Sequence, residues 1–239
     1  MKIYNKDNQL SEMYFLNNDK KEGEHTIYYN DGQLNVVYNY IDGKKEGERK
    51  RYYPNQILHS VYNFVNDKVD GEFKSYYNNG QIRELCYYVN GTMHGKHELY
   101  YDNGQLDTAC TRANNTIEGE SRMYYENGEL KIICNYIDGK MEGELKLYYD
   151  NGKLEEICNY VNNEIDGEFK SYHDNGQLHI TCNYFNGKVE GEYKSYHNNG
   201  QPCVICICVD GRLHGEFKSY YENGQLREIC NYVDGKKGT

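Results

Sequence analysis

The chain has 239 residues, a formal net charge of −10, a hydrophobic fraction of 38% and a mean hydropathy of −0.98. These values exclude a fold built around one large apolar core, and an acidic chain without a basic patch is a poor candidate for binding nucleic acid or an anionic membrane. We expect no secretory leader and no membrane-spanning segment, because no apolar run is long enough for either.

One glycine recurs every 24 residues along the chain. Its members are Gly23, Gly47, Gly71, Gly95, Gly119, Gly143, Gly167, Gly191 and Gly215. A fixed period of roughly 20 to 50 residues is typical of a repeat array. We therefore predict a single array over residues 1–239, with a partial unit at 1–22, full units starting at 23, 47, 71, 95, 119, 143, 167 and 191, and a partial last unit at 215–239.

Two further columns of glycine have the same period. The second column holds Gly32, Gly80, Gly104, Gly128, Gly152, Gly176, Gly200 and Gly224, with Gln56 as its exception; the third holds Gly43, Gly91, Gly139, Gly187, Gly211 and Gly235, with Asp67, Asn115 and Asn163 in the gaps. Asn and Asp tolerate positive φ better than other non-glycine residues do. All three columns are therefore predicted to be backbone turns.

The segments between the glycines alternate in the manner of β-strands. Residues 72–77 alternate charged with other side chains, residues 78–81 form an Asn-Gly-type turn, and the aliphatic and aromatic run 82–89 returns. Residues 90–95 are expected to form the return turn to the next hairpin. The predicted fold is all-β: an elongated, single-layer antiparallel meander of about nine to ten β-hairpin repeats of 24 residues, each advancing ~10 Å.

Three columns of large side chains are expected to fill the thin core of such a sheet. They are the tyrosines at 28, 52, 76, 100, 124, 148, 172, 196 and 220; the aliphatic stripe Leu34, Leu58, Ile82, Leu106, Leu130, Leu154, Leu178 and Leu226, broken by Pro202; and Val37, Val61, Leu85, Ile133, Ile157, Ile205 and Ile229. A neighbouring column is tyrosine except at His173 and His197. We interpret the tyrosines as a structural ladder, and an aromatic face that binds a partner peptide is the alternative.

Seven of the nine cysteines share one column. They are Cys86, Cys110, Cys134, Cys158, Cys182, Cys206 and Cys230. Equivalent residues of successive hairpins should lie ~10 Å apart, beyond the roughly 4.4–6.8 Å Cα separation of a disulfide. Free buried thiols are therefore predicted, which favours a reducing, cytoplasmic location without secretion. Cys203, Cys206 and Cys208 resemble a metal motif, but an extended strand spreads them apart, and no metal is expected.

No residue pattern indicates catalysis. His173 and His197 belong to neighbouring units, and His94 and His97 flank a predicted turn. A periodic sheet without insertions offers no obvious pocket in which polar groups converge. We expect no enzyme activity, no catalytic residues and no bound cofactor.

Acidic and basic residues form two columns that lie two positions apart. The acidic column is Glu24, Glu48, Glu72, Glu120, Glu144, Glu168, Glu192 and Glu216, and the basic column is Lys50, Lys74, Arg122, Lys146, Lys170, Lys194 and Lys218. Residues two apart on a strand share a face. We interpret these columns as a solvated face that keeps a long sheet in solution.

The repeated unit, seen in residues 71–81 and 186–191, resembles the MORN repeat in its second variant. The resemblance runs from about Tyr4 to Gly235 and implies a β-hairpin scaffold for protein contacts. It also implies the alternatives of a self-assembling element that forms a homodimer through terminal repeats, a lipid-associated module, or an antitoxin-like binding protein. The absence of Trp and the cysteine column depart from the common unit.

The protein partner and its binding residues cannot be read from the repeats. Units break their consensus at residues 54–56, at 111–113 and at Pro202 and Cys203. We interpret these breaks as drift that an array tolerates, because its stability is shared along the repeats. A partner surface at these positions is the alternative.

Overall fold

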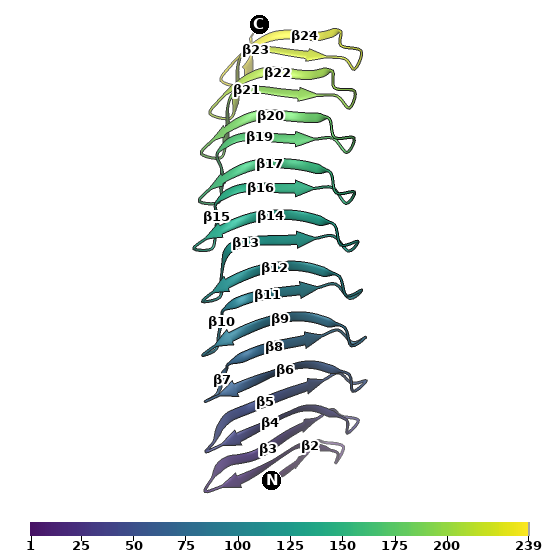
Figure 1. Cartoon of the computed structure of the whole chain (residues 1–239), viewed down its shortest axis with the longest axis vertical. Coiled ribbons are helices and arrows are strands. Elements are labelled where there is room, and N and C mark those ends of the chain that lie inside the picture. Colours follow the sequence, from purple (N-terminus) through teal and green to yellow (C-terminus); the bar gives the residue numbers. More distant parts are fainter. Residues whose placement is uncertain (239) are drawn as a thin grey trace. The chain divides into compact units, whose positions relative to one another are not determined.

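The computed structural model describes residues 1–238, and the contacts divide the chain into two compact units, residues 1–117 and 118–239. All regular elements of the described residues are β-strands. Within each unit, consecutive strands pair antiparallel and follow one another in chain order (Figure 1). The predicted class of antiparallel hairpin repeats of 24 residues is confirmed, whereas one uninterrupted array over the whole chain stays a prediction.

The first unit contains twelve complete strands. They are β1 (Lys2–Tyr4), β2 (Leu10–Asn17), β3 (Lys20–Tyr28), β4 (Leu34–Ile41), β5 (Lys44–Tyr52), β6 (Leu58–Val65), β7 (Lys68–Val69), β8 (Gly71–Tyr76), β9 (Ile82–Val89), β10 (Thr92–Met93), β11 (Gly95–Tyr100) and β12 (Leu106–Ala113). Strand β13 (Thr116–Tyr124) begins at the boundary between the units.

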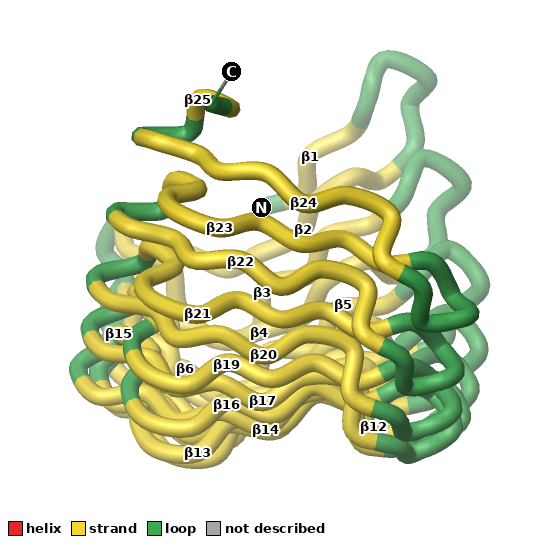
Figure 2. Tube along the Cα trace, turned by 90° about the horizontal axis from the view of Figure 1, so that it is seen from above, coloured by secondary structure: helices red, strands yellow, loops and turns green. Residues whose placement is uncertain are grey.

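The second unit continues the same alternation. Its strands are β14 (Leu130–Ile137), β15 (Lys140–Met141), β16 (Gly143–Tyr148), β17 (Leu154–Val161), β18 (Glu164–Ile165), β19 (Gly167–Tyr172), β20 (Leu178–Phe185), β21 (Lys188–Tyr196), β22 (Pro202–Val209), β23 (Arg212–Tyr220), β24 (Leu226–Val233) and β25 (Lys236–Lys237). In each unit the loops gather at the two ends of the strands, and the strands run between them (Figure 2).

Each repeat contains two different turns, one at each end of its long strands. At one edge, Asn90 and Gly91 both have positive φ, 53° and 84°, which is the type I′ geometry that matches the twist of the strands. Since Thr92 and Met93 already form β10, this turn is shorter than the predicted segment 90–95. At the other edge, Gly80 N donates to Tyr77 O (2.9 Å) and Tyr77 N donates to Gln81 O (2.8 Å), which closes a three-residue loop.

Gly23 and its equivalents lie within strands or at their first residue, so the prediction that this column forms turns was wrong. In β3, Glu22 pairs with Phe15 and Thr26 pairs with Met13, which leaves residues 23–25 opposite Tyr14 alone. This arrangement is a β-bulge, and Gly23 adopts a φ of 72° there. A Cβ on Gly23 would meet nothing within 4 Å, so the requirement for glycine is conformational.

The exceptions in the other two glycine columns adopt the predicted positive φ. Gln56 has a φ of 63°, Asp67 of 67° and Asn163 of 72°. The side chain of Asp67 adds a contact that glycine lacks, because its Oδ1 accepts a hydrogen bond from Lys45 N at 2.8 Å. Asn163 does the same for Met141 N at 2.6 Å.

The two faces of the sheet differ in burial. We call them the open face and the cysteine face, and the hairpin β16–β17 defines both: Glu144, Lys146, Tyr148, Leu154, Ile157, Asn159 and Val161 form the open face, and Leu145, Leu147, Glu156, Cys158 and Tyr160 form the cysteine face. The buried hydrophobic residues are Val36, Tyr38, Phe64, Cys86, Cys110, Cys134, Cys158, Cys182, Cys206 and Cys208, on the cysteine face. The expected core columns of Tyr, Leu and Ile instead lie on the open face, where most members are half-buried and Ile82, Leu226 and Ile229 are exposed, so that expectation was wrong.

Side chains link each hairpin to the next one along the chain. Tyr29, Tyr53 and Tyr77 in the first unit and Tyr125 and Tyr149 in the second donate their hydroxyls to backbone carbonyls of the following hairpin, over 2.6–2.8 Å. The Nε2 atoms of His173 and His197 reach the equivalent carbonyls at 2.9 and 3.1 Å. A tyrosine ladder therefore exists in the neighbouring column, which begins at Tyr29; its bonds cross between hairpins, and His173 and His197 preserve it.

Replacement of Tyr149 by Phe should lower the free energy of unfolding by about 0.5–1.5 kcal/mol, because the carbonyl of Tyr172 loses its donor. Denaturant unfolding of the full chain measures this change. Tyr148→Phe is the matched control, since the ladder does not use that hydroxyl, and it should change stability by less than about 0.5 kcal/mol. Equal losses in both variants would contradict a ladder that stabilises the array.

Candidate functional site

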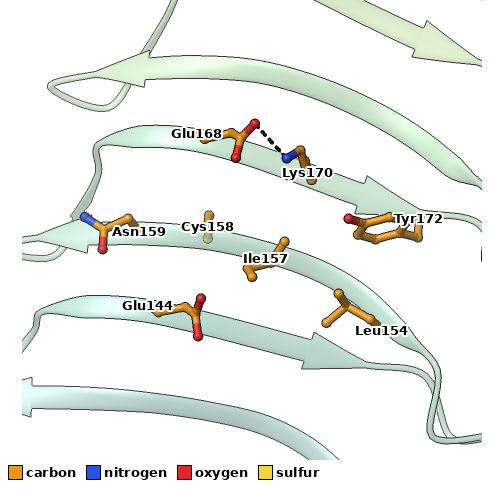
Figure 3. A pocket seen from close by; sticks show the side chains of 8 residues that line it. All are labelled: Glu144, Leu154, Ile157, Cys158, Asn159, Glu168, Lys170 and Tyr172. Carbon is orange, nitrogen blue, oxygen red and sulfur yellow. Dashed lines mark ion pairs between the residues drawn. The ribbon is translucent and has the colours of Figure 1, made fainter.

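The open face carries shallow depressions that repeat with the hairpins. One of about 280 Å³ is lined by Glu144, Leu154, Ile157, Cys158, Asn159, Glu168, Lys170 and Tyr172 (Figure 3). Another of about 250 Å³ is lined by the residues 24 positions earlier, from Glu120 to Tyr148. Each depression combines an apolar floor with a carboxylate and an ammonium group.

Ion pairs within single strands border these depressions. Lys170 Nζ lies 2.7 Å from Glu168 Oε1, and Lys146 pairs with Glu144 in the same way at 2.5 Å. The predicted acidic and basic columns therefore do share one face. The hydrogen bond to Glu168 raises the pKa of Lys170, but both groups are exposed, so the pair stabilises the fold little.

A column of exposed apolar side chains runs along the open face beside the type I′ turns. We call it the rim column; it consists of Ile41, Val65 and Val89 in the first unit and Ile137, Val161, Phe185, Val209 and Val233 in the second. Phe185 is 63% exposed and Ile41 is 55% exposed. Because these residues are still 41–63% exposed, packing within the fold accounts for only part of their apolar surface.

The structure separates the residues at which the units break their consensus. Gln56 lies in the loop between β5 and β6, where its Nε2 donates to Leu34 O at 3.1 Å. Arg112 lies in β12 on the cysteine face, and Pro202 pairs with Tyr196 at the start of β22. No site unites these positions, but Arg112 joins a cluster that sequence reasoning missed.

That cluster surrounds His97, which lies inside β11 and is only 6% exposed. Its Nε2 is 3.0 Å from Glu84 Oε1, and Arg112 Nε donates to its Nδ1 at 2.9 Å. Cys110, the cross-strand partner of His97, has its Sγ 4.0 Å from the same Nδ1. The sequence signal that could have revealed this cluster is that Glu84, His97 and Arg112 are all ionisable and lie on the same face of three neighbouring strands.

A second buried histidine, His25, lies at the start of the first unit. It is 2% exposed, stacks on Tyr38 at 4.8 Å, and its Nε2 lies 2.8 Å from Glu12 Oε1. Burial lowers the pKa of His25, Lys21 lowers it further, and Glu12 opposes both. Its equivalents in other repeats include Phe73, Phe169 and Phe217, so the site accommodates a ring.

All nine cysteines are free, as predicted, and six of the seven column members are buried. Burial, with Glu84 nearby, raises the pKa of the Cys86 thiol to about 12. Cys206 and Cys208 share the cysteine face, whereas Cys203 is less buried. Residues 1–238 contain no group of three or more His, Cys, Asp or Glu side chains that could hold a metal ion.

No helix within the described part of the chain could cross a membrane. The repeating bulges, turns and hairpins define the class of antiparallel hairpin-repeat scaffolds. The MORN repeat variant model matches nine segments, residues 21–42, 45–66, 69–90, 93–114, 117–138, 141–162, 165–186, 189–206 and 213–234. The chain therefore belongs to the MORN repeat family, in this variant form.

Comparison with individual proteins adds little to this assignment. No curated protein matches the chain. Crystal structures of TcdB2-TccC3 and of TcdB2-TccC3-Cdc42 match 99% of this chain at 14% identity, each with a TM-score of 0.21. The chain spans 17% and 16% of those two chains, respectively.

Acid should weaken the first unit through His25. The pKa of His25 is lowered in the folded state, whereas in the unfolded chain the same imidazole has a pKa of about 6.5. The unfolded state therefore binds more protons below that pH, and the stability that neutral His25 provides is complete above about pH 6.5 and falls as the pH drops below it.

His25→Phe should remove part of this pH dependence. Hydrogen exchange of the β3 and β4 amides at pH 8 and pH 5.5, corrected for the intrinsic exchange rate, measures it: protection should fall in the wild type and fall less in the variant. An unchanged pH dependence in the variant would show that His25 does not carry the effect.

Proposed function

We propose that this chain is a non-enzymatic scaffold that binds another protein through the open face of its sheet. The observation that carries the proposal is the rim column, where apolar side chains stay exposed in hairpin after hairpin. An array that only had to fold and remain soluble would gain from polar residues at these positions.

The surroundings of the rim column support a protein partner. Across the type I′ turn, Ile41, Ile137 and Phe185 pair with Lys44, Lys140 and Lys188. Apolar anchors bordered by charged and polar groups are typical of protein interfaces, where the anchors carry affinity and the polar rim fixes orientation. The half-buried tyrosines of the depressions, such as Tyr172, add aromatic surface of the kind enriched at interfaces.

The depressions themselves favour binding over catalysis. They are open, shallow and nearly identical from one hairpin to the next, with a Glu–Lys pair as the polar element. An enzyme needs converging groups with different protonation roles in one water-poor site. The free thiols further support a proposed reducing environment.

The test replaces three rim residues together: Val161→Thr, Phe185→Thr and Val209→Thr. They are 41%, 63% and 46% exposed, and threonine suits a strand, so stability should change little. The matched control places threonine at Asp150, Asp174 and Asn198, which are exposed loop positions of the same region.

Wild type and both variants are used in parallel to capture proteins from the native host, and each captured protein is then purified and its affinity measured by calorimetry. At least about a tenfold loss of affinity is expected for the rim variant, a size typical of removing anchor residues, with no loss for the loop control. A partner that binds the rim variant as tightly as wild type would refute the open face as the binding surface.

A further inference from the structure

The seven column cysteines form a natural series in which one member has different surroundings. Their cross-strand partners in the two units include Phe73 for Cys86, Ser121 for Cys134, Leu145 for Cys158 and Phe169 for Cys182. Cys110 alone among the column faces a histidine, His97. Exposure does not distinguish these thiols, since Cys110 is 6% exposed and the others named here are 2–5% exposed.

His97 can take the proton of this thiol once Arg112, whose Nε donates to its Nδ1, turns away. Nδ1 lies 4.0 Å from Cys110 Sγ, and the opposite nitrogen, Nε2, lies 3.0 Å from Glu84 Oε1. A carboxylate behind an imidazole stabilises the imidazolium that forms when the ring takes a proton. Hydrogen bonds with Cys110 and Glu84 raise the pKa of His97 to about 9.

Arg112 adds a permanent positive charge beside the thiol. Its Nη1 is anchored on Asn115 O at 2.8 Å, and its Nε donates to His97 Nδ1 at 2.9 Å. This bond opposes protonation of Nδ1, so the guanidinium has to turn when the proton arrives. Turned toward the sulfur, its charge would stabilise a thiolate.

The remaining titratable groups of the first unit that face the cluster lie on β9. They are Glu84, Cys86 and Tyr88, which share one face of that strand. Burial raises the pKa of Tyr88, so this phenol stays neutral near pH 7. Cys86 has the opposite environment to Cys110, because its nearest charged partner is the carboxylate of Glu84, with Sγ to Oε1 at 4.0 Å.

We propose that Cys110 is a modification site, a thiol that His97 deprotonates and that small, uncharged soft electrophiles alkylate. The thiol proton passes to His97 Nδ1, the sulfur attacks the electrophilic carbon, an S–C bond forms, and the leaving group departs with the electron pair of its bond to carbon. Cys110 is 6% exposed, so the electrophile reaches it through side-chain motion; Glu84 and Arg112, which contact its partner His97, are themselves only half-buried.

Iodoacetamide labelling of the folded full chain tests this, with the rate at each cysteine read by mass spectrometry. At pH 7, Cys110 should react at least about fivefold faster than Cys86, Cys134, Cys158 and Cys182, because pairing with His and Arg increases the thiolate fraction.

Two variants separate activation from local opening. His97→Phe, which places the residue of the Phe73 and Phe169 positions there, and Arg112→Tyr, the residue of Tyr88 and Tyr136, should each reduce the Cys110 rate toward that of Cys134. If the fold loosens instead, Cys86 and Cys134 will accelerate as well, and the Cys110 to Cys134 ratio still reports activation. A wild-type ratio near one, or a ratio unchanged by His97→Phe, would overturn the proposal.

Discussion

The fold of each unit depends on backbone positions that must adopt positive φ. Each full repeat has four of these positions, at three places: one at the bulge inside the strand, two in the type I′ turn and one in the three-residue loop. An L-residue in this region costs roughly 1–2 kcal/mol, so glycine, Asn and Asp hold these places while the strands between them vary. The bulge also leaves residues 23–25 opposite a single residue, so that β3 pairs with β2 on both sides of the bulge while residues 23–28 pair with β4.

A sheet fixed in this way has nearly all of its buried side chains on one face, with Thr26 as an exception. The cysteine face is filled by small thiols and by aromatic rings such as Tyr38 and Phe64, whereas most members of the Tyr, Leu and Ile columns of the open face stay half-buried. Links between hairpins therefore matter as much as apolar packing. The tyrosine ladder and carboxylate caps, such as Glu22 Oε2 accepting from Asp42 N at 2.8 Å, tie the edges together. These contacts recur between neighbours, which is how a quasi-one-dimensional array distributes its stability.

Periodicity was sufficient to predict the hairpins, the free thiols and the shared face of the Glu and Lys columns, because each follows from a 24-residue period and a strand period of two. It could not identify the core face. Both faces of this sheet carry apolar columns, and only the three-dimensional structure distinguishes them: Cys158 is 2% exposed and Val161 is 41% exposed. The sequence predicts a turn at Gly23 because a bulge and a turn require the same φ. His97 was placed beside a turn for the same reason, since the bulge glycine Gly95 precedes it, and so its contact with Cys110 was not foreseen.

In a repeat array of this kind, a single substitution at one position of the repeat changes the contacts of one hairpin and leaves the others unchanged. Histidine in place of tyrosine at position 173 keeps the bond to the next hairpin, because Nε2 reaches the same type of carbonyl at 2.9 Å. Histidine at position 97 does something different: it stands opposite a cysteine, with a carboxylate on one neighbouring strand and a guanidinium on the other. The same residue type thus links two hairpins at position 173 and faces a thiol at position 97. The role of a residue that departs from the repeat therefore depends on the face on which it lies and on its cross-strand partner. The size of its departure from the consensus matters less.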